Sequence, residues 1–129
     1  MRILLDTHIL LWALTEPDRL GQRVRAEIEY QANDVLFSAA SIWEIAIKSR
    51  LGRIDFPVRP DEIAATARES GFVELPVTSA AAALVATLAQ HHRDPFDHLL
   101  IAQAMNEPAR LLTADAVLVP YSELVTLIG

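Results

Sequence analysis

Two carboxylates lie three residues apart at the start of an apolar stretch, in the segment HHRDPFDHLLIA at residues 91–102. Three further acidic residues lie shortly after apolar runs elsewhere in the chain. The five candidates are Asp6, Glu44, Asp94, Asp97 and Asp115. Like charges that converge in one cleft repel each other, so cations or protonation must offset that repulsion. Because the chain has no cysteine, an oxygen-only ligand set favours Mg²⁺ or Mn²⁺ over Zn²⁺.

Each acid also has a purely structural explanation. Asp94 precedes a proline and can cap a helix, and taken alone it is more typical of a cap than of a catalytic residue. Asp97 can close a capping box from the third helical position. Glu44 can pair with Lys48, four residues later, although its neighbours are apolar. Asp6 can simply end a strand and Asp115 can lie in a turn, but five such coincidences at one place are improbable.

The apolar runs predict the elements that must position these side chains. Strands are expected at residues 3–5, 35–37, 72–75 and 111–113, with a possible fifth at 124–128. Helices are expected at residues 7–14, 22–31, 38–52, 61–71, 79–90 and 94–107. Gly52 is expected to end the third of these helices and Asp61 to cap the fourth. This alternation predicts an α/β fold, with a central parallel sheet of four to five strands and helices on both faces. We expect a single domain over residues 1–129.

A parallel sheet binds ligands beyond the carboxyl ends of its strands. Asp6 directly follows the first expected strand, and Asp115 comes two residues after the fourth. Glu44 lies two turns into the helix that follows the second strand, while Asp94 and Asp97 open the helix before the fourth. All five acids can therefore reach one end of the sheet, which predicts a divalent-metal site there.

Five other polar residues are weaker candidates for contacts with substrate or with metal-bound water. Thr7, Ser38 and Thr113 lie at strand ends, where helix capping is the more ordinary role. Lys48 and Arg93 suit phosphate contacts and equally suit ion pairs with the acids. The histidines have structural explanations: His8 on a helix face, and His91 with His92 at the C-terminus of a helix, where a cationic ring complements the dipole.

The charge and composition of the 129-residue chain limit its partners. A net charge of −6 argues against a broad basic face for nucleic acid. However, the five candidate acids account for most of this negative charge, because the charges of the other twelve acidic residues are nearly balanced by the eleven lysines and arginines. No apolar run approaches the roughly 18 residues of a membrane span, and no secretory signal is visible. We therefore expect a cytoplasmic protein without a membrane segment.

Four motifs, in order and spread over essentially the full chain, resemble the PIN-domain ribonucleases. They read DTHILLW, SxxSxWEIAIKxxLG, HHRDPFDHLLIAQA and LLTAD, and they most resemble VapC-like toxins of type II toxin–antitoxin pairs. The resemblance implies a PIN-like fold with an Mg²⁺- or Mn²⁺-dependent site that cleaves RNA. Carried over by motif, its catalytic, metal-binding acids are Asp6, Glu44, Asp97 and Asp115, with Asp94 as an additional acid. His98 stands where we expect arginine in the nearest relatives.

The resemblance also implies partners and a reaction. We expect an RNA substrate, a small cognate antitoxin and a homodimer. The expected reaction is phosphodiester hydrolysis by metal-activated water, which leaves a 5′-phosphate and a 3′-hydroxyl.

Other functions fit less well. A phosphatase of the haloacid-dehalogenase type needs DxDxT after the first strand, where this chain reads DTHIL. A receiver domain needs paired acids there, and Asp6 stands alone. The remaining alternative is a catalytically silent PIN-like module that binds RNA or an antitoxin without cleavage.

Overall fold

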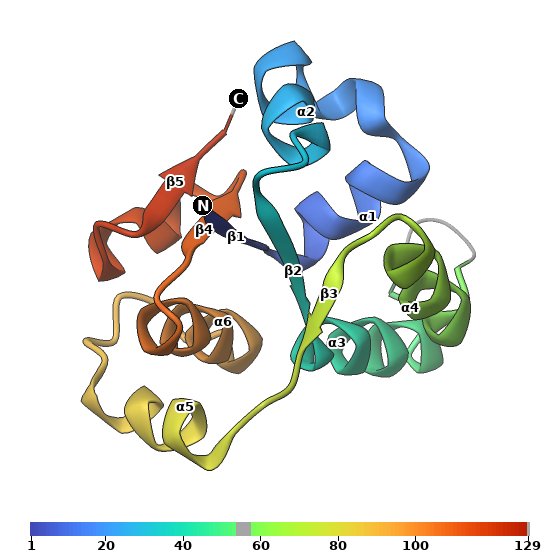
Figure 1. Cartoon of the computed structure of the whole chain (residues 1–129). Coiled ribbons are helices and arrows are strands. Elements are labelled where there is room, and N and C mark those ends of the chain that lie inside the picture. Colours follow the sequence, from blue (N-terminus) through green and yellow to red (C-terminus); the bar gives the residue numbers. More distant parts are fainter. Residues whose placement is uncertain (54–57, 129) are drawn as a thin grey trace.

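In the computed structural model, which describes residues 1–53 and 58–128, a five-stranded parallel sheet forms the centre of the molecule (Figure 1). The strands are β1 (Arg2–Leu5), β2 (Asp34–Ser38), β3 (Val73–Leu75), β4 (Arg110–Thr113) and β5 (Val125–Leu127). Their order is β3-β2-β1-β4-β5, and every neighbouring pair is parallel. The predicted α/β fold, including the fifth strand, is confirmed.

Helices cover both faces of this sheet. They are α1 (Thr7–Thr15), α2 (Gln22–Glu29), α3 (Ala39–Arg50), α4 (Pro60–Glu69), α5 (Ser79–Leu84) and α6 (Pro95–Asn106). Short 3₁₀ helices follow three of the elements: η1 (Pro17–Leu20), η2 (Val85–Thr87) and η3 (Ala116–Tyr121). Figure 1 shows α1 to α4 on one side of the sheet, with α5 and α6 on the other. None of the helices in the described ranges is long and apolar enough to cross a membrane.

The alternation of side chains along β1 explains why both faces are covered. Ile3 and Leu5 pack into the apolar cluster under α1 to α4, whereas Leu4 packs into the opposite cluster with Leu100 and Ile101 of α6. All five of these side chains are fully or almost fully buried. Burying each such side chain contributes about 1.5–3 kcal/mol, so the central strand is held from both sides.

The helix expected at residues 79–90 is shorter than predicted. The α5 helix ends at Leu84, and a 3₁₀ turn continues to Thr87. The Thr87 hydroxyl donates to the Leu84 carbonyl at 2.8 Å, the group that the Leu88 N–H would use in a continued α-helix. That N–H bonds to Val85 O instead. A side chain that competes for backbone groups therefore ends the helix.

Two other helix ends test the sequence signals. Gly52 has a left-handed φ of +70° after α3, and the Arg53 N–H bonds back to Lys48 O at 2.8 Å, so the predicted glycine stop is confirmed. By contrast, α4 begins at Pro60, and Asp61 lies in its first turn rather than at its N-cap. The Asp61 carboxylate pairs with Arg59, so the cap predicted for Asp61 is wrong.

Candidate acidic site

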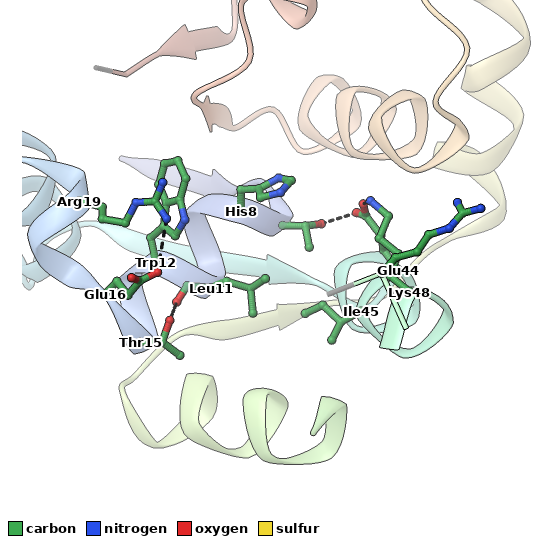
Figure 2. Close-up of a pocket in the computed structure, with 11 residues that line it drawn as sticks. His8, Leu11, Trp12, Thr15, Glu16, Arg19, Glu44, Ile45 and Lys48 are labelled. Carbon is green, nitrogen blue, oxygen red and sulfur yellow. Dashed lines mark hydrogen bonds and ion pairs between the residues drawn. The ribbon is translucent and has the colours of Figure 1, made fainter. Parts of the chain in front are cut away.

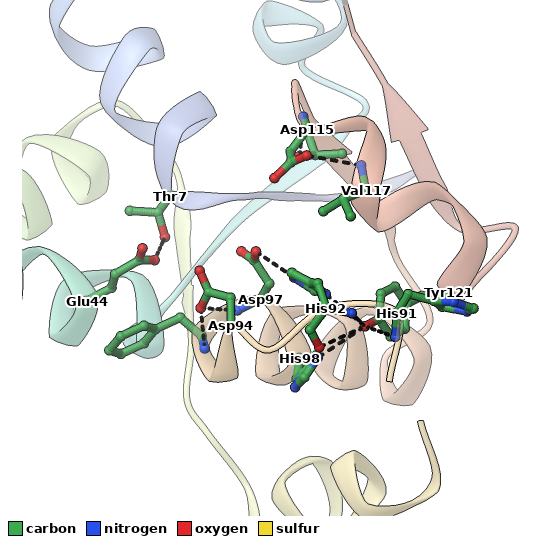
Figure 3. A network of polar contacts seen from close by, with 12 residues as sticks. Thr7, Glu44, His91, His92, Asp94, Asp97, His98, Asp115, Val117 and Tyr121 are labelled. Atoms are coloured by element: carbon green, nitrogen blue, oxygen red, sulfur yellow. Dashed lines mark hydrogen bonds and ion pairs between the residues drawn. The ribbon is translucent and has the colours of Figure 1, made fainter. Parts of the chain in front are cut away.

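The carboxyl ends of the three central strands meet at one edge of the sheet. Asp6 follows β1, helix α3 follows β2, and Asp115 lies just beyond β4. Figure 3 shows the carboxylates of Glu44, Asp94, Asp97 and Asp115 around one opening at this edge. The fold therefore brings acids from four remote segments to the place expected from their order in the sequence.

Asp6 is held at the centre of this edge by the backbone around it. Its Oδ1 accepts the Ile9 N–H at 2.9 Å as the N-cap of α1, and its own N–H donates to Leu112 O of β4. Asp6 is only 6 % exposed. Burial raises the pKa of its carboxyl group, and hydrogen bonds from Thr113 and Ile9 only partly oppose this effect. The charge of Glu44 raises that pKa further, which shows that these two acids are electrostatically close.

Glu44 is even more buried, at 3 % exposed. Its Oε1 accepts the Thr7 hydroxyl at 2.6 Å, and its Oε2 pairs with the Lys48 ammonium at 2.5 Å. Partial desolvation lowers the pKa of Lys48, but the hydrogen bond and charge of Glu44, together with Asp94 and Asp97, outweigh it, so that pKa is raised. The Glu44–Lys48 pair is therefore part of the acidic site rather than a solvated surface pair.

Asp94 and Asp97 open helix α6 in different ways. Asp94 is its N-cap, and one carboxylate oxygen accepts the N–H groups of Phe96 and Asp97 at 2.9 and 3.3 Å. Asp97 contacts the His92 ring instead, with Oδ2 at 3.0 Å from Nε2, and this is not the contact of a capping box. The pKa of Asp97 is raised to about 6, mainly by burial. The hydrogen bond from His92 lowers this pKa, whereas the charges of Asp94 and Glu44 raise it further.

Asp115 lies on the β4 side of the opening and is exposed. Its Oδ1 accepts the Val117 N–H at 3.0 Å as the N-cap of η3, and its own N–H donates to the Thr113 hydroxyl at 3.0 Å. Thr113 is fully buried and also lowers the pKa of Asp6 by hydrogen bonding. Thr113 therefore connects two of the candidate acids.

Ser38 is fully buried and turned toward α6. Its hydroxyl donates to Gln103 Oε1 at 2.5 Å and accepts the Ala40 N–H at 2.9 Å as the N-cap of α3. The amide of Gln103 in turn donates to Pro76 O. The capping role predicted for Ser38 is confirmed, while its partner Gln103, 65 positions away, gave no signal in the sequence.

Replacing Ser38 by Ala is expected to lower the free energy of unfolding by about 1–3 kcal/mol, because Gln103 Oε1 loses its buried donor. Chemical denaturation followed by circular dichroism measures this change. Ser49→Ala on the exposed side of the same helix is the matched control, with an expected change within about 0.5 kcal/mol. Equal effects of the two substitutions would contradict the role of the Ser38–Gln103 bond.

The histidines have positions that the sequence did not predict. His91 and His92 lie beyond η2 in an irregular segment, so the prediction that they end a helix is wrong. His92 contacts Asp97 and Tyr121, and His98 contacts the His92 carbonyl and the same tyrosine. Arg93 is exposed next to this segment.

The acids of this site fit a divalent cation by their chemistry. Burial raises the pKa of both Asp6 and Asp97, and a bound cation would remove the penalty for ionising them. As the side chains stand within residues 1–53 and 58–128, no group of three or more His, Asp or Glu residues is arranged to hold an ion. The Lys48 ammonium supplies positive charge beside Glu44 instead. Binding of a divalent ion at this site would therefore require the side chains to adjust.

A groove of about 850 Å³ runs from this site along α1 (Figure 2). Thr7, Glu44 and Lys48 form the end next to the acids, and Trp12 and Arg19 lie farther along it. The Arg19 guanidinium stacks over the Trp12 ring at 4.3 Å from its centroid. The groove thus has the acidic site at one end and, farther along, an aromatic ring with a cationic group stacked on it.

Comparison with known proteins identifies the family. The model of the PIN domain matches residues 3–122. The chain belongs to the PIN-domain family. This PIN domain is 31 % identical over 117 residues to Ribonuclease VapC22 from Mycobacterium tuberculosis, covering 88 % of this chain and 86 % of that protein. The resemblance to VapC-like members of the family is confirmed.

Two solved structures share the fold. The first is VapBC2 from Rickettsia felis, bound to a DNA fragment from its promoter. It has a TM-score of 0.70 at 14 % identity and covers 98 % of this PIN domain and 97 % of the matched chain. The second is FitAcB from Neisseria gonorrhoeae, with a TM-score of 0.54 at 21 % identity, covering 90 % and 89 %. At these identities the likeness concerns the fold.

Proposed function

We propose that this PIN domain is a metal-dependent endoribonuclease and the toxin of a toxin–antitoxin pair. The observation that carries the proposal is the burial of two carboxylates, Asp6 and Glu44, at the carboxyl edge of the sheet, where Figure 3 shows Glu44 around the same opening as Asp97 and Asp115. A purely structural cap or surface ion pair does not require acids so close together that the charge of buried Glu44 raises the pKa values of both Asp6 and Asp97. The similarity to a ribonuclease over most of both chains supports the same conclusion.

Mg²⁺ or Mn²⁺ would be held by Asp6, Glu44, Asp97 and Asp115, with Asp94 as an additional ligand. When bound, such ions lower the pKa of water and stabilise the leaving oxygen of a phosphodiester. Among the acids, Asp115 is the exposed one, and its described contact engages one carboxylate oxygen. We therefore assign to Asp115 the orientation of the attacking water.

The cationic and hydroxyl side chains complete the proposed reaction. Thr7 and Lys48 hold the Glu44 carboxylate in place, and we assign phosphate contacts to Lys48 and the exposed Arg93. Thr113 fixes the positions of Asp6 and Asp115 by hydrogen bonds to both residues. The hydroxyl of Ser38 bonds to Gln103, and we assign it no part in the reaction. The expected products carry a 5′-phosphate and a 3′-hydroxyl.

The groove beside Glu44 suits a single RNA strand. The Arg19 guanidinium covers one face of the Trp12 ring. A base can stack on this guanidinium or take its place on the ring, and the cationic group can contact the RNA backbone. These residues are therefore the first candidates for substrate contacts outside the acidic site.

The proposed function includes partners and a compartment. We assign to this toxin a small cognate antitoxin, a homodimeric state, a single domain and a cytoplasmic location. The VapBC2 structure that shares its fold is a complex bound to promoter DNA, which supports the toxin–antitoxin assignment. Exposed apolar side chains at Val117, Val119 and Leu127 provide surface for a protein partner.

The test is a cleavage assay on a pool of cellular RNAs with Mn²⁺, with Mg²⁺ and with a chelator. We expect discrete cuts only when a divalent ion is present, with 5′-phosphate ends at the mapped sites. RNA that is bound but remains intact under all three conditions would favour the alternative, a catalytically silent PIN-like module. The Asp6→Asn/Glu44→Gln double variant, purified in parallel, controls for contaminating ribonucleases.

A further inference from the structure

The Tyr121 hydroxyl is the centre of a hydrogen-bond network behind the acidic site (Figure 3). It accepts the backbone N–H groups of His91 and His92 at 2.9 and 3.0 Å. It also lies 2.8 Å from His92 Nδ1 and 3.1 Å from His98 Nε2. The far side of the His92 ring reaches Asp97, with Nε2 at 3.0 Å from Oδ2. The network therefore connects η3, the loop before α6 and one candidate catalytic acid.

The direction of each bond follows from what the groups can donate. His98 Nε2 lies 2.9 Å from the His92 carbonyl, which can only accept, so this nitrogen carries a proton. The Tyr121 oxygen accepts from the two backbone N–H groups and has one proton to give. Its acceptor is His92 Nδ1 at 2.8 Å, since the His92 carbonyl is 3.5 Å away.

The tautomer of His92 is then determined. A neutral imidazole with an acceptor at Nδ1 carries its proton on Nε2. That proton points at Asp97 Oδ2. The ring itself is clamped, because His98 packs edge-on against it at 4.9 Å between centroids and Tyr121 at 5.3 Å. The side chains of His92 and Asp97 are only 16 % and 19 % exposed, so solvent competes weakly for these bonds.

We propose that Tyr121 and His92 position the Asp97 carboxylate: Tyr121 holds neutral His92 in its Nε2–H tautomer, and His92 donates to Asp97 Oδ2. Figure 3 shows His92 on the side of Asp97 that is away from Glu44, with the Asp97 carboxylate facing the opening shared with Glu44, Asp94 and Asp115. The importance of this arrangement for cleavage rests on the proposed function. His92 and Tyr121 are positioning residues, and neither is assigned a contact with RNA.

The tautomer can be measured without any cleavage assay. In the metal-free wild-type protein at neutral pH, long-range ¹H–¹⁵N correlation spectra of the histidine rings report which nitrogen carries the proton. We expect an unprotonated Nδ1 and a protonated Nε2 for His92. Tyr121→Phe removes the proton that Nδ1 accepts, and we expect His92 to become a mixture of tautomers. A wild-type His92 with a protonated Nδ1 would overturn the proposal.

Cleavage by two His92 variants tests the positioning role. His92→Leu cannot donate to Asp97, whereas His92→Gln keeps a terminal N–H donor. Loss of an outer-shell partner typically costs about 10–100-fold in activity or metal affinity. We expect a loss of this size in the kcat of His92→Leu, and we expect His92→Gln to retain most of the wild-type kcat. His91→Leu is the matched control, because its ring packs on Tyr121 at 4.7 Å while the described contacts of Asp97 involve His92.

The outcomes separate the two proposals. Equal losses in the Leu and Gln variants, with thermal stability preserved, would show that donation from His92 is not needed. Wild-type protein that cleaves no RNA would end the proposed function, while the tautomer measurement would still decide how Tyr121 and His92 hold Asp97.

Discussion

Asp6→Asn and Glu44→Gln are each expected to reduce divalent-metal-dependent RNA cleavage by more than about 100-fold while preserving the fold. Loss of an outer-shell partner of a metal site typically costs about 10–100-fold, and these two residues are assigned to the metal directly. Cleavage is measured on mapped sites in RNA under single-turnover conditions, so that the rate of the chemical step is compared. Circular dichroism measured alongside reports the fold.

The fold should survive both changes for a local reason. Asn at position 6 can still accept the Ile9 N–H and cap α1, because Asn and Asp are equally good caps. Burial raises the pKa of Asp6, so the neutral amide also removes a desolvation penalty at neutral pH. Gln at position 44 can still accept the Thr7 hydroxyl.

The matched controls for these changes are Asp34→Asn and Glu29→Gln, which alter exposed acids and should leave cleavage unchanged. Continued turnover by a rigorously purified Asp6→Asn/Glu44→Gln double variant would contradict the assignment of these residues to catalysis.

Mn²⁺ is expected to raise the thermal stability of the wild-type protein saturably at pH about 7.5 and only weakly at pH about 5. Binding to the folded state alone stabilises by about 2.7 kcal/mol when the free ion is 100 times its dissociation constant. The measurement is the unfolding midpoint as a function of Mn²⁺ concentration at each pH. Ionic strength is held constant, because nonspecific screening acts on all charges.

The sign of the pH dependence follows from Asp97. Its pKa is about 6 in the folded protein and 3.8 without the fold. Ionised Asp97 therefore destabilises the metal-free fold, and this penalty is absent below pH 3.8 and complete above pH 6. A divalent ion binds the ionised carboxylate, so its stabilising effect is full above pH 6 and is lost as protons compete below that value. The raised pKa of Asp6 acts in the same direction.

The control for the metal titration is the Asp6→Asn/Glu44→Gln double variant, whose midpoint should not respond saturably to Mn²⁺. Asp97→Asn should weaken the response at pH about 7.5 and reduce its dependence on pH. An equal Mn²⁺ response in wild type and double variant would place the ion elsewhere on the protein.

Local sequence patterns determined the framework of this PIN domain. Apolar runs such as residues 3–5 and 111–113 predicted strands β1 and β4 to within one residue, because burial on both faces of a parallel sheet demands continuous apolar runs. Once strands and helices alternate, the parallel arrangement places Asp6 and Asp115 at one edge. The sequence was therefore sufficient to predict which acids lie at this edge of the sheet.

Tertiary structure decided how those groups behave. Ser38 bonds to Gln103, 65 positions away in the sequence, and His92 bonds to Tyr121, 29 positions away. No local periodicity of the sequence encodes such contacts. The rise in the pKa of Asp97 comes from burial and from neighbouring charges that include Glu44 of another helix. The sequence thus determines which functional groups are present and at which edge of the sheet they lie. Desolvation, hydrogen-bond direction and charge coupling depend on distances across the fold, and only the packed molecule sets them.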